Sequence, residues 1–272
     1  MTSDLRALFG QAVEHAAAYR SGVGEGPARP LESYHASRER FLGPLPETGM
    51  DPQVMLAELA ATAAPGLMPT IGPRFFAWVM GASHEAGVAA EILVAAWGQN
   101  SGYQMTSPAA AAIEETAERW LLDILDLPRE AGIGFSTGAT VANGTCLAAA
   151  RTGTLLKTGW DPDADGLFGA PPVHVLIGAD AHSSLFSSLQ LIGFGRKRVI
   201  TIDTDAEGRM LPSALETAIA GLSGPKVVIA QAGQINTGAY DPFGDIVAVA
   251  RTHDAWVHVD GAFGLWARAV PE

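Results

Sequence analysis

The sequence is poor in cysteine and in lysine, and each scarcity narrows the chemistry that the chain can perform. Cys146 is the only cysteine among the 272 residues. An internal disulfide and a cysteine-based zinc site are therefore excluded, and a cytoplasmic location is expected. Lysine occurs only as Lys157, Lys197 and Lys226.

Positive charge is also scarce. Lysine and arginine together number 17 against 29 acidic residues, and the net charge is −12. Nucleic acids and anionic membrane surfaces attract basic faces, so neither is expected as a partner. No uncharged apolar run of about 18 residues could span a membrane. Charged side chains interrupt the first 18 residues, which excludes a signal peptide.

What the sequence does contain is typical of a globular protein, with 48% hydrophobic and 17% charged residues. Residues 1–75 are predicted to form a helical N-terminal arm. Its first helix has an apolar stripe made of Leu5, Leu8, Val13 and Ala17. Another surface must bury this stripe, and a partner subunit is one candidate. Residues 76–272 are predicted to form one large domain, in which Ser107 and Pro108 begin a helix over 108–127.

Strands and helices alternate from about residue 131 onward. The predicted strands are short apolar runs at 173–179, 198–202, 226–232 and 256–262. The predicted helices cover 140–151, 183–193, 212–222 and 242–253. This alternation predicts an α/β fold with a mostly parallel sheet and helices on both faces. Ligands of such sheets bind beyond the carboxyl ends of the strands.

The turn at residues 136–140 reads Ser-Thr-Gly-Ala-Thr and leads into a helix. Free backbone N–H groups at a helix start form an anion site, and hydroxyl groups add donors. A tight strand-to-helix turn capped by Thr140 is the plain alternative. Neither the P-loop pattern nor the dinucleotide fingerprint is present.

Asp260 closes an apolar strand, Trp-Val-His-Val-Asp. A carboxylate buried there is costly unless something positive pairs with it. A protonated cofactor ring nitrogen is one partner, and neighbouring backbone N–H groups are another. His258 stands two residues earlier and faces the same side, so the two could also ligate a metal.

Other strand ends carry polar residues too. His182 follows the strand at 173–179, where it could stack on a flat ring, act as an acid or base, or simply lie in a helix-capping region. Asn236 and Thr237 follow the strand at 226–232, in a turn whose Asp241 could cap the next helix. All of these residues are expected at one edge of the sheet.

Five motifs in this order resemble the group II pyridoxal-phosphate-dependent amino acid decarboxylases, which include aromatic amino acid, glutamate and diaminobutyrate decarboxylases. They are Ser-Pro-Ala-Ala at 107–110, Ser-Thr-Gly-Ala-Thr-Val-Ala-Asn at 136–143, Asp-Ala-His-Ser-Ser at 180–184, Asn-Thr-Gly-Ala-Tyr-Asp-Pro at 236–242 and His-Val-Asp-Gly-Ala at 258–262. The resemblance implies the aspartate aminotransferase type fold and pyridoxal 5'-phosphate as cofactor.

The resemblance also implies residue roles. The cofactor phosphate would contact Gly138, Ala139 and Thr140. His182 would stack on the pyridine ring and Asp260 would pair with its nitrogen, and these two are the expected catalytic residues. Ala262 would pack against the ring, with Asn236 and Thr237 near its substituents. Val141 departs from the family, which often has an acid there.

A second departure is the missing lysine. In the family, the lysine that holds the cofactor as a Schiff base lies in a His-Lys pair a few dozen residues beyond the position of Asp260. Only twelve residues follow Asp260 here, and none is lysine. The chain is therefore expected to stop before this lysine and the C-terminal small domain, and to be inactive by itself.

The resemblance implies a homodimer that decarboxylates an L-amino acid when complete. Amino transfer and carbon–carbon lysis are alternatives, because one fold hosts all three reactions. A lysine-free, non-catalytic binding chain is a third hypothesis, and a metal site at His182, His258 and Asp260 is a minor fourth.

Overall fold

The computed structural model describes residues 4–270. The chain divides into two compact units, one up to Gly98 and one from Gln99 onward. The boundary expected between residues 75 and 76 lies inside the first unit, and the assignment of residues 76–272 to one cofactor-binding domain stays a prediction. Within the described part of the chain, no helix is long and apolar enough to cross a membrane.

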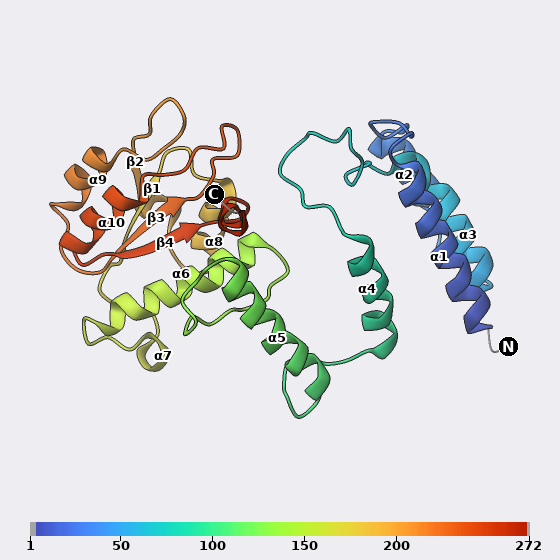
Figure 1. Cartoon of the computed structure of the whole chain (residues 1–272), viewed down its shortest axis with the longest axis horizontal. Helices are drawn as coiled ribbons and strands as arrows, with labels where there is room; N and C mark the ends of the chain where they lie inside the picture. Colours follow the sequence, from blue (N-terminus) through green and yellow to red (C-terminus); the bar gives the residue numbers. More distant parts are fainter. Residues whose placement is uncertain (1–3, 271–272) are drawn as a thin grey trace. The chain divides into compact units, whose positions relative to one another are not determined.

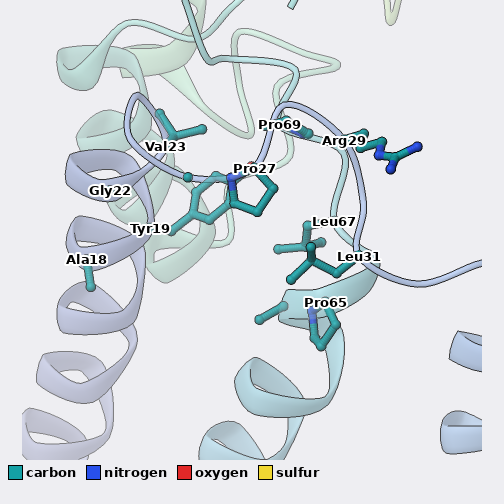
Figure 2. Close-up of a pocket in the computed structure, with 12 residues that line it drawn as sticks. Ala18, Tyr19, Gly22, Val23, Pro27, Arg29, Leu31, Pro65, Leu67 and Pro69 are labelled. Atoms are coloured by element: carbon teal, nitrogen blue, oxygen red, sulfur yellow. The ribbon is translucent and has the colours of Figure 1, made fainter. Parts of the chain in front are cut away.

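The first unit is helical, with α1 at Leu5–Gly22, α2 at Tyr34–Phe41, α3 at Pro52–Ala63, the 3-10 turn η1 at Ala64–Gly66 and α4 at Glu85–Trp97. Asp4 and Asp51 cap α1 and α3 by accepting backbone N–H groups of the first turns. α1 packs along α3, where Gln11 Nε2 donates to the Gln53 carbonyl at 3.1 Å. Figure 2 shows a largely apolar hollow between the end of α1, the following turn and the segment after α3.

No residue described between positions 4 and 98 is buried. Large apolar side chains such as Phe9 and Leu59 are each 50% exposed. A helical unit normally buries one apolar face against another element. Because none of its described residues is buried, this part of the chain has no core of its own.

The second unit contains a four-stranded sheet and the other helices of the described part of the chain (Figure 1). The strands are β1 at His174–Gly178, β2 at Val199–Ile202, β3 at Lys226–Gln231 and β4 at Trp256–Asp260. The helices are α5 at Pro108–Ile124, α6 at Ala139–Leu156, α7 at Pro162–Asp165, α8 at Ser183–Leu191, α9 at Pro212–Ile219 and α10 at Phe243–Thr252, with 3-10 turns η2 at Arg196–Arg198 and η3 at Gly264–Ala269.

The sheet order is β2-β1-β3-β4, and every pairing is parallel. One buried apolar cluster joins Leu176 and Val228 to α9 and α10, and a second joins Ile177 and Ile229 to α6 and α8. Helices therefore cover both faces of the sheet, as Figure 1 shows. The prediction of an α/β fold with a parallel sheet and flanking helices is confirmed.

Candidate functional site

The carboxyl ends of β1, β3 and β4 meet at one edge of the sheet. The chain leaves β1 to form β2 on one side and then returns past β1 to form β3 on the other. In parallel sheets such a reversal of strand order opens a crevice between the two neighbouring strands. His182 follows β1, the segment 232–240 follows β3, and Asp260 is the last residue of β4. Topology thus gathers the predicted residues at this edge.

Helix α6 begins at Ala139, one residue before the predicted start. Gly138 is its N-cap and makes no side-chain capping bond. The first-turn N–H groups of Ala139 and Thr140 precede the first intrahelical bonds, which Val141 and Ala142 donate to the Gly138 carbonyl. Because this turn is exposed, its N–H groups and the helix dipole are available to an anion.

Helix α6 lies along one face of β4. Trp256 touches the helix at Gly153, where an added Cβ would lie 3.0 Å from Trp256 Cζ3. His258 comes two residues later, and its Nε2 lies 2.9 Å from Asn143 Oδ1. Alternate strand residues share a face, so Asp260 is the next residue on this face toward the start of α6. The strand thereby directs a carboxylate toward the end of α6 that favours anions.

Asp260 is buried, with only 6% of its surface exposed. Its Oδ1 accepts the Ala262 N–H at 3.2 Å. Within residues 4–270 it forms no ion pair with lysine, arginine or histidine. A buried carboxylate without a cationic partner is costly. This chemistry fits a ligand that brings a protonated nitrogen.

His182 is the N-cap of α8, and its Nδ1 accepts the Ser184 N–H at 3.3 Å. That bond leaves the exposed ring faces available for stacking. The backbone N–H of His182 donates to Gln231 Oε1 at 3.1 Å. Gln231 ends β3 and is the register partner of Asp260. A single side chain therefore links His182 to the strand position beside Asp260.

Sequence reasoning missed Gln231. Its place as the last residue of the strand that precedes Asn236 and Thr237 was the one available signal. Ser188 was also missed; its hydroxyl donates to the Thr140 carbonyl at 2.7 Å and ties α8 to the start of α6. Both contacts join residues about 50 positions apart, which no local pattern records.

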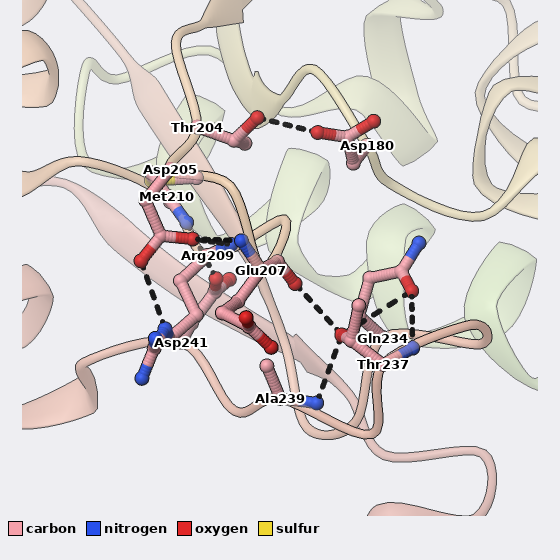
Figure 3. A network of polar contacts seen from close by, with 10 residues as sticks. All are labelled: Asp180, Thr204, Asp205, Glu207, Arg209, Met210, Gln234, Thr237, Ala239 and Asp241. Atoms are coloured by element: carbon pink, nitrogen blue, oxygen red, sulfur yellow. Dashed lines mark hydrogen bonds and ion pairs between the residues drawn. The ribbon is translucent and has the colours of Figure 1, made fainter.

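Thr237 lies in a tight loop after β3, as Figure 3 shows, and Asn236 is the residue before it. Gln234 Oε1 accepts their backbone N–H groups at 2.6 and 3.0 Å. The Thr237 hydroxyl donates to the Glu207 carbonyl at 2.7 Å, so this hydroxyl is engaged within the protein. A contact of either residue with a cofactor ring stays a prediction.

Asp241 does not cap α10 as the sequence suggested, because Pro242 is the N-cap and makes no side-chain bond. Its buried carboxylate instead accepts the backbone N–H groups of Met210 and Gln231 at 2.8 and 2.7 Å. Burial raises the pKa of Asp241, while these hydrogen bonds oppose the rise. The carboxylate therefore joins the loop after β2 to the end of β3, and Figure 3 shows Asp241 beside Met210 in that loop.

The metal alternative finds no support among the residues described. No group of three or more histidine, cysteine, aspartate or glutamate side chains between positions 4 and 270 is placed to hold an ion. His258 Nε2 faces an amide of α6, and His182 Nδ1 caps α8.

Comparison with known proteins agrees with this geometry. Residues 38–268 match the model of the pyridoxal-dependent decarboxylase conserved domain. The chain is 33% identical over 227 residues to L-2,4-diaminobutyrate decarboxylase of Rhizobium meliloti, covering 82% of this chain and 44% of that protein. It is 30% identical over 287 residues to tryptophan decarboxylase 1 of Oryza sativa, covering 99% and 55%.

A solved structure, Oryza sativa TDC with PLP and tryptamine, superposes with a TM-score of 0.86 at 27% identity and covers 100% of this chain and 60% of that one. The chain thus spans about half the length of the curated relatives that it matches. The family suggested by the five motifs is confirmed: the chain belongs to the pyridoxal-dependent decarboxylase family.

Proposed function

We propose that the protein of which this chain is part decarboxylates an L-amino acid with pyridoxal 5'-phosphate. The observation that carries the proposal is Asp260, a buried carboxylate without a cationic partner among the described residues, in a chain whose family is pyridoxal-dependent. The protonated pyridine ring of the cofactor supplies an electron sink when it is bound.

Each predicted residue then has a physical task. The first turn of α6, at Gly138, Ala139 and Thr140, would hold the phosphate through backbone N–H groups. The ring of His182 would stack on the pyridine, and Asp260 would hold the proton on the pyridine nitrogen. Ala262 would pack against the ring, and Asn236 and Thr237 would lie near its substituents.

The Schiff-base lysine is proposed to lie outside these 272 residues. Each of the three lysines lies near the amino ends of the strands, opposite the edge where Asp260 lies. Lys226 begins β3, and Lys197 precedes β2. Lys157 follows α6 and pairs with Asp254, just before β4 begins. None of them stands at the carboxyl edge where Asp260 lies, so the chain by itself is expected to bind the cofactor without turnover.

The natural reading frame past codon 272 gives the test. We expect a His-Lys pair within a few dozen codons and, from the extended protein, CO₂ released from a carboxyl-labelled L-amino acid. The matched control replaces only the lysine of that pair with alanine and should abolish release. Formation of a keto acid would assign amino transfer instead, and a stop codon directly after Glu272 would favour a non-catalytic binding chain.

A homodimer is part of the proposal. Its support is the first unit, whose helices have apolar side chains but no buried residue between positions 4 and 98. A second copy of the chain would cover these side chains, consistent with the apolar stripe of α1.

A further inference from the structure

Two buried side chains that the proposed mechanism does not use lie behind Asp260. Asn143 is in the second turn of α6 and His258 is in β4, and each is only 6% exposed. Asn143 Oδ1 and His258 Nε2 are 2.9 Å apart. The pair joins the helix that begins with the phosphate turn to the strand that ends with Asp260.

The contact defines the tautomer of His258. An amide oxygen only accepts hydrogen bonds, so the proton of the neutral ring must be on Nε2. Burial lowers the pKa of His258, and the nearby Asp260 carboxylate opposes that effect more weakly. The register partner of His258 on β3 is the apolar Ile229, which offers no charge. The contact with Asn143 Oδ1 therefore places a proton on Nε2, and burial favours an uncharged ring.

The cost of this arrangement points to a role beyond packing. Asn143 Nδ2 is buried and has no hydrogen-bond partner in the described part of the chain. Leaving such a donor unsatisfied opposes folding, and apolar residues of similar shape would avoid the penalty. A polar pair with an unsatisfied donor contributes little to the stability of the fold. We therefore look for its role in its effect on the neighbouring Asp260.

We propose that Asn143 and His258 are positioning residues that keep a neutral Nε2–H imidazole beside Asp260, so that the charge of this carboxylate is directed to the cofactor nitrogen alone. A cationic imidazole would share that charge and weaken its hold on the pyridine proton. The inference rests on the proposed function, because it assigns the nitrogen partner to Asp260.

Nuclear magnetic resonance of the ¹⁵N-histidine-labelled chain, without cofactor, tests the tautomer. We expect His258 to show the neutral Nε2–H pattern throughout a titration from about pH 8 to 5.5, across the ordinary histidine pKa. An Nδ1–H or a cationic His258 in the parent chain would overturn the proposal.

Binding of ¹⁵N-labelled pyridoxamine 5'-phosphate tests the positioning role. Asn143→Asp keeps the acceptor oxygen but adds a negative charge, so His258 should become cationic. The pyridine nitrogen of the probe should then lose its proton, and the affinity of the chain for the probe should fall about tenfold. Asn143→Leu combined with His258→Phe should fold at least as stably as the parent, because it removes the unsatisfied Asn143 Nδ2, and it should leave the pyridine nitrogen protonated, because no cation is then beside Asp260. A role in packing alone would instead lower the stability of the double variant, and Asn143→Asp would leave the pyridine nitrogen protonated.

The two proposals fail in different ways. If the parent chain does not bind the probe, the proposed function and the positioning role fall together, whatever the tautomer of His258. If the parent chain binds the probe with its ring nitrogen protonated, and Asn143→Asp leaves both the affinity and the ring protonation unchanged, the positioning role alone is wrong.

Discussion

At the scale of single residues, Asp260 carries the largest expected effect. Asp260→Asn preserves the shape of the side chain but removes its charge, so it can no longer hold a proton on a pyridine nitrogen. We expect binding of pyridoxal 5'-phosphate to this chain to weaken about tenfold or more, as measured by absorbance titration. Asp245→Asn, at an exposed position in the first turn of α10, is the matched control. Equal affinities for the two variants would contradict the assignment of Asp260.

Gln231 offers a second test, since its side chain accepts the His182 N–H at 3.1 Å. Gln231→Ala removes that acceptor and should let the start of α8 shift. We expect cofactor affinity to fall about threefold to tenfold, in line with one lost hydrogen bond. Gln231→Glu retains an acceptor oxygen and should restore most of the affinity. Gln190→Ala, at an exposed position of α8, should have no effect; if it weakens binding as much as Gln231→Ala, the specific role of Gln231 is wrong.

At the scale of elements, short apolar runs in the sequence predict all four strands, with helical stretches between them. The strands end within two residues of the predicted positions because each is a continuous apolar run bounded by glycine, proline or polar residues. The parallel direction of the strands is predicted as well, since each connection contains a helix, whereas the strand order is not. The phosphate turn was visible because its small and hydroxyl residues directly precede a helix.

The contacts between elements could not be predicted in the same way. Asn143 and His258 are 115 positions apart, and Gln231 and His182 are 49 apart. Such pairs depend on which helix covers which strand, and a single sequence does not encode that in any local pattern. Asp241 shows the limit well, because a helix-capping position proved to bind the backbone of a distant loop.

The packing of α6 on β4 gives a prediction for this scale. Gly153 lets Trp256 approach the helix, and a Cβ there would lie only 3.0 Å from Cζ3 of its ring. Gly153→Val should therefore force the helix away from the strand and lower the free energy of unfolding by about 1–3 kcal/mol. Denaturant titration measures this, with Ala149→Val at an exposed position of the same helix as control. Equal stability of the two variants would show that α6 and β4 adjust freely.

At the scale of the whole molecule, the two units differ in how they are stabilised. The second unit has apolar clusters on both faces of its sheet, whereas the first has no buried residue between positions 4 and 98. Helix propensity and capping alone stabilise short helices only marginally in water. The first unit therefore needs an apolar surface from elsewhere, and a second copy of the chain is the occupant that we propose.

Sedimentation equilibrium tests this proposal directly, and we expect the mass of a dimer. Phe9 is 50% exposed on α1, so Phe9→Lys should place a charge in the dimer interface and raise the dissociation constant about tenfold or more. His15→Lys, at an exposed polar position of the same helix, should leave the dimer intact. A monomeric parent chain would contradict the homodimer. A dimer that Phe9→Lys does not weaken would show that α1 lies outside the interface, and the exposed apolar side chains of α3 would then be the next surface to change.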